Sequence, residues 1–281
     1  MSEILSEKEF DLVIEPRRSK KNYWNDLWRF RELFIFLAWR DILVRYKQTV
    51  IGLSWSLIRP FLTMVVMTIV FGKLAKMPTD GNVPYPILVY AAMLPWQFFS
   101  TSFSEASNSL VASSNLLTKI YFPRLIIPAS TVIVNFVDFL ISFIILIGLM
   151  IWYHFVPSLT ILCLPLFLGL AFLSAMGAGL YVAALNVKYR DFRYIVPFVV
   201  QFGMYISPVG FSSNNIPEKW RLLYSINPMV GVIDGFRWSI SGGQSRIYLP
   251  GMLLSIGLVI LLLIFSVWYF RKMEKTFADI V

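Results

Sequence analysis

Three ionisable side chains fall inside long apolar stretches of the sequence, where a charge is costly unless it is bonded or protonated. They are Arg59, Glu105 and Asp138. The rise of a helix places Arg59 and Glu105 at a similar depth, so they can form the ion pair that buried charges usually need. Asp138 is either a functional carboxylate or one that is hydrogen-bonded to Asn135, Ser142 or another helix.

The sequence lacks the residue patterns of common catalytic sites. A single histidine, His154, and a single cysteine, Cys163, make a His/Cys metal site implausible. The Gly72–Lys73 pair has Met67 and Leu74 at the positions where a P-loop requires Gly and Ser or Thr. No GxSxG motif occurs either. We therefore expect no metal site, no nucleotide site and no enzymatic activity in this chain itself.

The elements that carry these residues are predicted to be membrane helices. The chain is 57% hydrophobic and 15% charged, whereas a soluble domain is about half apolar and about a quarter charged. Apolar runs reach the roughly 20 residues that a helix needs to cross a bilayer. The fold class is therefore predicted to be an all-α integral membrane protein with six transmembrane helices. The expected spans are about 54–75, 85–109, 126–152, 157–185, 194–212 and 247–270.

Basic residues indicate the orientation of these spans. With the N-terminus inside, 19 of the 25 Lys and Arg residues fall on cytosolic segments, as the positive-inside rule requires. Both termini are thus expected in the cytosol of a multi-pass protein, and residues 1–27 form a polar cytosolic tail without a secretory signal peptide. We assign the net charge of +9 to orientation and to contact with anionic membrane lipids, and not to nucleic acid.

Residues 28–50 are predicted to form an amphipathic interface helix along the inner leaflet. Trp28, Ile35 and Trp39 fall at heptad spacing on one side, and basic residues lie beside them. Trp suits the headgroup level, and Arg and Lys can extend their charges towards water. The alternative is a helix of a cytosolic domain.

Four stretches together resemble the permease subunit of polysaccharide-exporting ABC transporters of the ABC-2 type. They are "RYKQTVIGLSWSLIRP" (45–60), "TKIYFPRLIIP" (118–128), "LNVKYRDF" (185–192) and "IPEKWRLLYSINPMVGVIDGFRW" (216–238). Their order and spacing match this family over nearly the whole chain after residue 28. The resemblance implies an ABC-2 type transmembrane domain over 28–281 with six spans, a homodimer, and two copies of a separate ATPase subunit that binds ATP and Mg. It also implies that a lipid-linked glycan leaves through a central channel.

The resemblance implies export of undecaprenyl-linked polysaccharide, with O-antigen as the expected cargo, across a bacterial inner membrane. Capsule and teichoic acid precursors are the alternative cargoes. Two other classes remain open at this point: an ion-driven membrane transporter and a membrane enzyme that acts on lipid-linked sugars.

The cytosolic stretch 113–130 lies between the second and third predicted spans. Its prolines disfavour helix at the residues before them, and Ser113 is a good N-cap, which frames a short helix at about 115–122. We interpret it as the coupling helix that contacts the ATPase; the alternative is a simple interfacial turn. The residues expected at this contact, with the next inner loop, are Leu116, Lys119, Ile120, Tyr121, Phe122, Arg124, Tyr189, Arg190 and Asp191.

Aromatic and hydroxyl side chains of the spans suit a glycan path, because sugar faces stack on rings and sugar hydroxyls need polar partners. The expected channel lining is Trp55, Tyr90, Trp96, Gln97, Phe99, Ser100, Phe103 and Tyr205. The outer segment 213–246 is predicted to form short re-entrant helices that gate the exit, with Trp220, Tyr224, Phe236 and Trp238 as gate residues. Arg45, Lys47 and Arg59 flank the junction with the first span and are expected to bind the diphosphate of the lipid carrier.

Overall fold

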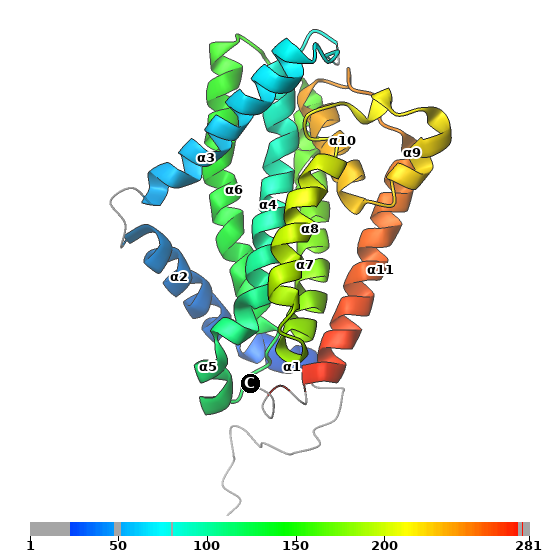
Figure 1. Ribbon diagram of the computed structural model, residues 1–281. Helices are drawn as coiled ribbons and strands as arrows, with labels where there is room; N and C mark the ends of the chain where they lie inside the picture. The colour runs from blue at the N-terminus through cyan, green and yellow to red at the C-terminus, as the bar shows by residue number, and fades with distance from the viewer. Residues whose placement is uncertain (1–22, 48–51, 80, 275–276, 278–281) are drawn as a thin grey trace, which may run out of the picture.

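The computed structural model describes residues 23–47, 52–79, 81–274 and 277, with side chains in the second range from residue 57, and these residues contain no strand (Figure 1). Its N-terminal part contains α1 (Tyr23–Arg29), α2 (Arg31–Lys47), α3 (Gly52–Met67) and the π-helical η2 (Thr68–Leu74). The central part contains α4 (Tyr85–Ala112), α5 (Ser114–Lys119), α6 (Ile126–Trp152), the short 3-10 helix η3 (Leu159–Cys163), α7 (Leu164–Lys188) and α8 (Phe192–Ile206). The C-terminal part contains η4 (Ser213–Asn215), α9 (Glu218–Tyr224), α10 (Pro228–Ile240) and α11 (Leu249–Met273).

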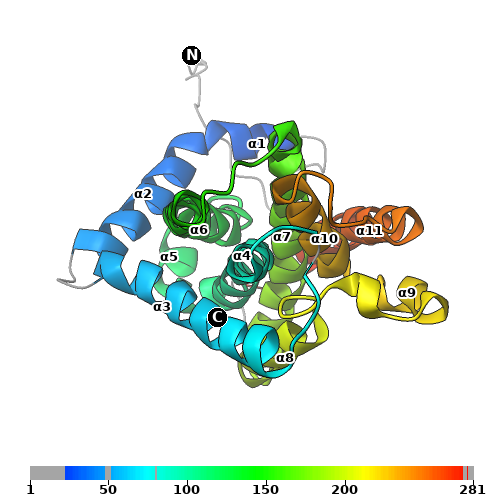
Figure 2. The same cartoon turned by 90° about the horizontal axis from the view of Figure 1, so that it is seen from above.

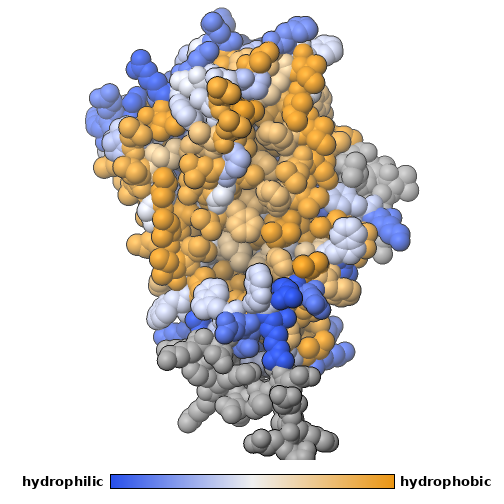
Figure 3. All heavy atoms as spheres, turned by 180° about the vertical axis from the view of Figure 1, so that it is seen from behind, coloured by the Kyte–Doolittle hydropathy of each residue, from blue (hydrophilic) through white to orange (hydrophobic). Residues whose placement is uncertain are grey.

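Four stretches of the described helices are long and apolar enough to cross a membrane. They are Leu57–Leu74, Ile126–Trp152, Leu159–Lys188 and Leu249–Met273. Apolar side chains also form a broad band across the middle of one face of the molecule, with hydrophilic side chains at both ends (Figure 3). The predicted all-α membrane class is therefore confirmed, and the chain is a multi-pass membrane protein.

The count of six spans stays a prediction, because two of the six expected segments differ from the rest. Helix α4 has 28 residues, but its Ser, Thr, Asn and Gln side chains and Glu105 lower its hydropathy. Helix α8 has only 15 residues, fewer than the roughly 20 that a straight crossing needs. It ends at Ile206, where the prediction extended the span to 212.

Helix α4 lies at the centre of the bundle. Seen from above, it is enclosed by α3, α6, α7, α8 and α10 (Figure 2), and almost every residue of its outer half is buried. Small residues allow α7 to approach it closely: a Cβ at Gly179 would lie 2.8 Å from the Cβ of Ala106. Close approach through small residues is a common way to pack membrane helices.

Helix α2 packs against α6 at the end of the bundle that the basic residues predict to face the cytosol, which we call the cytosolic end (Figure 1). Leu37 of α2 is buried, while Ile35 and Trp39 of α2 and Trp28 of α1 are exposed. The predicted helix therefore forms with an exposed apolar side suited to the headgroup region, and its position along the inner leaflet stays a prediction. It begins earlier than predicted, at Tyr23, and is divided into α1 and α2 at Phe30; its predicted residues 48–50 lie outside the described ranges.

A second hydrophobic cluster, which we call the cytosolic cluster, closes the cytosolic end of the bundle. It joins Leu37 of α2, Leu117 of α5, Phe122 in the following loop, Phe270 of α11, and Phe277. Burial of such side chains contributes about 1.5–3 kcal/mol each. The short helix α5 is therefore held against its own chain by an apolar side.

The outer segment also folds more tightly than predicted. Helix α9 lies on the surface, whereas α10 is buried against α4, α7 and α11. Asn227 caps α10 by accepting a hydrogen bond from the Met229 N–H. Arg237 of α10 is only 4% exposed and donates to the carbonyl oxygens of Val209 at 2.9 Å and Phe211 at 2.5 Å. These bonds hold the chain that follows α8 against the core.

Candidate functional site

A charged cluster joins the interface helix α2 to α4 and α6. The Arg45 guanidinium donates to the Glu105 carboxylate on α4 at 2.6 Å and to the Asp138 carboxylate on α6. It also donates to the Asn135 amide oxygen at 3.0 Å. The Tyr46 hydroxyl donates to Asp138 as well. We call these five residues the inner cluster.

Asn135 fixes the orientation of the inner cluster. Its amide nitrogen donates to Glu105 at 2.9 Å and to the Thr131 carbonyl oxygen at 3.1 Å. The side chains of Arg45, Glu105 and Asp138 are 30%, 40% and 25% exposed, so the ion pairs are only partly buried and lie at the wall of a cavity. With both carboxylates ionised, the cluster of one cation and two anions carries a net charge of −1.

The expected pairing of Arg59 with Glu105 is wrong, because Glu105 pairs with Arg45. Helix α2 packs against α6, and the Arg45 side chain reaches Glu105 on α4, a residue 60 positions away in the sequence. The Arg59 side chain is exposed at the wall of a neighbouring cavity. For Asp138, the alternative of bonding to another helix is confirmed, with α2 as that helix.

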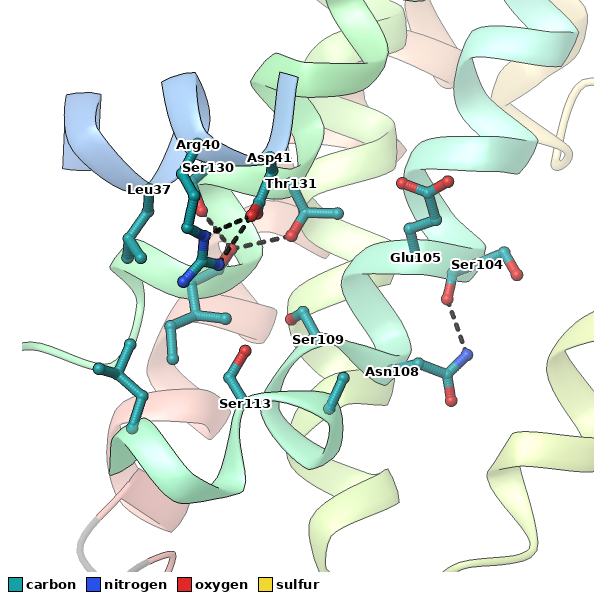
Figure 4. Close-up of a pocket in the computed structure, with 13 residues that line it drawn as sticks. Leu37, Arg40, Asp41, Ser104, Glu105, Asn108, Ser109, Ser113, Ser130 and Thr131 are labelled. Atoms are coloured by element: carbon teal, nitrogen blue, oxygen red, sulfur yellow. Dashed lines mark hydrogen bonds and ion pairs between the residues drawn. The ribbon is translucent and has the colours of Figure 1, made fainter. Parts of the chain in front are cut away.

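Two cavities meet at Glu105. The lower cavity, about 470 Å³, lies between α2, α4, α5 and α6, next to the predicted coupling helix. Figure 4 shows its polar wall, with Arg40 and Asp41 of α2 across from Glu105 and Asn108 of α4. The upper cavity, about 390 Å³, is lined by Arg45, Arg59, Gln97, Thr101, Glu105, Asn135, Asp138 and Ser142, with Leu94, Phe98 and Phe139. The inner cluster therefore separates two polar hollows along one side of α4.

The predicted coupling residues lie at the cytosolic end, but they do not share one environment. Helix α5 ends at Lys119, so it is shorter than the predicted 115–122. Lys119, Ile120 and Tyr121 are exposed, and Leu116 is half-buried. Phe122 is instead buried in the cytosolic cluster, so its side chain is not available to a partner. This corrects its expected role.

Arg124 is bound to the C-terminal segment of its own chain. Its backbone N–H donates to the Glu274 carboxylate at 2.7 Å, and its guanidinium donates to the Glu274 carbonyl oxygen. The guanidinium also lies 5.8 Å from the ring centre of Phe277. Arg124 thus positions the loop after α5 and is not a simple surface charge. In the second inner loop, Tyr189, Arg190 and Asp191 are all exposed.

Half of the eight expected channel residues lie inside the bundle of this one chain. Tyr90, Trp96, Ser100 and Phe103 are buried, and the Tyr90 hydroxyl donates to the Ser142 carbonyl oxygen at 3.0 Å. Because α4 is the central helix, these side chains face neighbouring helices, which corrects their expected place on a channel wall.

The remaining channel candidates have other surroundings. Gln97 lines the upper cavity, and Phe99 is partly buried beside Trp96 and Phe103. Tyr205 is exposed on α8. The side chain of Trp55 lies outside the described part of the structure.

The gate candidates divide between the surface and the core. Trp220 of α9 is exposed, and the Tyr224 hydroxyl donates to the Ile206 carbonyl oxygen at 2.6 Å, which ties α9 to the end of α8. Phe236 is fully buried and Trp238 is partly buried. Phe236 is therefore a core residue, because α10 packs inside the bundle.

From the sequence, Asn135 was expected only as one alternative partner of Asp138, and Tyr46 was given no role in a site. In the structure, Asn135 bonds Arg45 and Glu105, and Tyr46 bonds Asp138. One signal was present: Asn135 and Asp138 are three residues apart, so they share a face of a helix. Lys47, the other diphosphate candidate on α2, is exposed. Among the described residues there is no group of three or more His, Cys, Asp or Glu side chains that could hold a metal ion.

The fold and the site define a helical membrane protein in which helix α2 is ion-paired to α4 and α6. Residues 32–241 match the ABC-2 type transporter family. The chain belongs to this family of membrane permeases, as its sequence motifs predicted.

Several proteins are similar to this chain over most of their length. It is 27% identical over 258 residues to the O-antigen export system permease protein RfbA of Klebsiella pneumoniae, covering 89% of this chain and 95% of the relative. It is 26% identical over 215 residues to the protein of the same name from Myxococcus xanthus, covering 75% and 81%. It is 24% identical over 237 residues to the capsule polysaccharide export inner-membrane protein CtrC of Neisseria meningitidis, covering 81% and 86%.

Proposed function

We propose that the chain is the transmembrane subunit of an ATP-driven exporter that moves undecaprenyl-linked polysaccharide from the cytosolic to the outer side of the bacterial inner membrane. The observation that carries this proposal is its membership of the ABC-2 family together with relatives named for polysaccharide export. O-antigen is the proposed cargo, since three of the relatives are O-antigen permeases. Capsule and teichoic acid precursors are the other candidates.

The energy for transport is proposed to come from two copies of a separate ATPase subunit, which bind ATP and Mg. The tip of α5, formed by Lys119, Ile120 and Tyr121, supports a docking site for this subunit. These residues are exposed at the cytosolic end (Figure 1), while Leu117 and Phe122 hold the tip firmly to the bundle. A fixed helix with an exposed apolar tip can insert into a groove and pass on its movement.

We propose six membrane crossings with both termini in the cytosol. They comprise α3 with η2, α4, α6, η3 with α7, α8 with the segment up to 212, and α11. Helix α9 is proposed to lie at the outer leaflet beside the exit, with Trp220 and Tyr224 as its gate side chains. The bonds of Arg237 to the segment after α8 support a fold in which this segment stays packed inside the protein, as membranes require of irregular backbone.

A homodimer is proposed to form the export channel. Helix α8 supports this proposal because it carries a row of exposed aromatic side chains, Tyr194, Phe198, Phe202 and Tyr205. They recur every three or four residues, so they share one face of the helix. All four rings can stack on sugar faces, the hydroxyls of Tyr194 and Tyr205 can bond sugar hydroxyls, and a second copy would enclose this face of α8.

Deletion of the gene in its source bacterium tests the proposed function. We expect the surface polysaccharide to be lost and its undecaprenyl-linked precursor to accumulate inside, with both effects reversed by the gene on a plasmid. Chemical analysis of the accumulated glycan distinguishes O-antigen from capsule and teichoic acid. An unchanged surface polysaccharide and no accumulated precursor would contradict the exporter assignment.

A further inference from the structure

We propose that Arg45 and Glu105 form a latch between the lower and upper cavities, which the phosphate of a lipid-linked substrate opens by competing for Arg45. The inference rests on the proposed function, because that function supplies a lipid substrate with a diphosphate. The inference adds to that function a specific site, the Arg45–Glu105 pair, and a specific event, in which Arg45 exchanges Glu105 for the phosphate.

The position of the ion pair gives the first argument. Glu105 lines both cavities, and Arg45 lines the upper one. Their 2.6 Å contact therefore lies where the two hollows meet. Separation of these two side chains would join the hollows into one polar path along α4, from the level of α5 towards Gln97.

The hydrogen-bonding partners of the two carboxylates give the second argument. When Arg45 leaves, Glu105 still accepts a hydrogen bond from Asn135 at 2.9 Å, and Asp138 still accepts one from Tyr46. Breaking a buried ion pair is expensive when it leaves a charged group without a hydrogen-bonding partner. Here each carboxylate keeps a donor after Arg45 has left, so that cost is avoided. The inner cluster is thus built so that Arg45 can exchange partners.

The distribution of charge gives the third argument. Arg45 faces two carboxylates that compete for one guanidinium, and Arg59 lines the same upper cavity. A diphosphate can bind one guanidinium through two parallel hydrogen bonds and still reach a second cation. In the lower cavity, Arg40 is paired with its neighbour Asp41 at 2.7 Å. The cations beside the upper cavity are therefore the ones that suit a diphosphate.

The test measures binding of undecaprenyl diphosphate to the full chain in lipid nanodiscs, with undecaprenol as the control ligand that lacks phosphate. Glu105→Gln keeps the acceptor for Asn135 but removes the competing charge, so binding should become about three-fold tighter, as expected for loss of a half-exposed ion pair. Arg45→Gln should weaken binding about ten-fold, because a bidentate phosphate contact is lost. Arg246→Gln is the control, because Arg246 is exposed and lines neither cavity; it should leave binding unchanged.

A latch predicts opposite effects on affinity: tighter binding for Glu105→Gln and weaker binding for Arg45→Gln. If the ion pair were purely structural, both variants would be less stable and neither would bind the ligand more tightly. If Arg45→Gln does not fold, Arg45→Lys serves in its place, since lysine keeps the charge but cannot bind phosphate bidentately. The latch is overturned if Glu105→Gln binds no tighter than the parent, or if the parent does not prefer undecaprenyl diphosphate to undecaprenol. Nanodiscs rich in phosphatidylglycerol show whether a simple phosphate headgroup competes; complete competition would also overturn the assignment to the substrate. The deletion phenotype tests the exporter assignment separately.

Discussion

Tyr121 and Phe122 are neighbours in the sequence but lie in opposite environments. Tyr121 is 55% exposed and Phe122 is 3% exposed. The sequence predicted that both would contact the ATPase, because both lie in one short aromatic stretch. In the fold, the chain turns inwards after Tyr121, and Phe122 completes the apolar cluster with Leu117. Of these two rings, only Tyr121 remains accessible to a partner.

Separate alanine substitutions should therefore have different consequences. Phe122→Ala leaves a cavity in the cytosolic cluster and should destabilise the permease by about 3–5 kcal/mol. Tyr121→Ala should change stability by about 0.5 kcal/mol or less but weaken association with the ATPase subunit. Thermal unfolding in detergent and co-purification of the ATPase measure the two effects. A stable Phe122→Ala variant that loses its ATPase would show that the assignment of the two rings is reversed.

The inner cluster shows which part of the site the sequence could predict. Arg59, Glu105 and Asp138 stood out as charges in apolar stretches, and two of them belong to the cluster. Their partner could not be predicted, because Arg45 is 93 positions from Asp138 and no local pattern links α2 to α6. Ion pairs between distant elements depend on how the helices pack, which a single sequence does not determine.

At the scale of elements, Glu274 joins three segments at the cytosolic end. It follows α11, accepts the backbone N–H of Arg124 after α5, and lies against Tyr23 of α1. The Arg271 guanidinium stands 4.5 Å from the centre of the Tyr23 ring. Burial raises the pKa of Glu274, while nearby donors, chiefly the Arg124 N–H, oppose the increase.

This raised pKa predicts a pH dependence. The folded state holds the Glu274 proton more tightly than the unfolded chain does, so its contribution to stability is complete below the ordinary carboxyl pKa of about 4.3. The contribution is lost as pH rises through the raised pKa. Glu274→Gln keeps the acceptor for Arg124 and does not titrate. The melting temperature of Glu274→Gln minus that of the parent should therefore increase from pH 4 to pH 7. A difference that stays constant or decreases would show that Glu274 does not have a raised pKa in the folded protein.

Arg237 is the corresponding link at the outer end. Arg237→Met would leave the carbonyl oxygens of Val209, which is buried, and of Phe211, which is partly buried, without this donor, at a cost of about 1–3 kcal/mol for a buried unsatisfied group. Arg246→Met is the matched control, because Arg246 is exposed near the same end and should change stability little. Thermal unfolding in detergent measures the effect, and we expect a lower melting temperature for Arg237→Met than for Arg246→Met. Equal melting temperatures would show that Arg237 does not hold this segment.

Some helix boundaries follow from the local sequence, whereas others depend on contacts with distant parts of the chain. The span predicted for 126–152 coincides with α6, Ile126–Trp152, because a long apolar run determines its own extent. The span predicted for 194–212 ends at Ile206 in α8, since the residues after it are held by Arg237 on α10. The outer segment was predicted to form re-entrant gate helices, and the burial of α10 could not be predicted because it depends on packing against α4 and α7, which are distant in the sequence.

For the whole molecule, the central claim is that this permease moves a lipid-linked polysaccharide only with a separate ATPase. The sequence contains no P-loop motif, which is why we propose that a partner subunit supplies ATP hydrolysis. The exposed tip of α5 is the proposed docking site for that partner, and the inner cluster links α2 to α4 and α6. We therefore propose that transport requires two different polypeptides, the permease and its ATPase subunit.

The most direct test is transport in liposomes that contain the purified permease with or without its ATPase subunit. The account predicts that lipid-linked polysaccharide crosses the bilayer only when both proteins and MgATP are present, and that the permease alone hydrolyses no ATP. ATP hydrolysis by the permease alone, or transport that needs neither ATPase nor ATP, would contradict it.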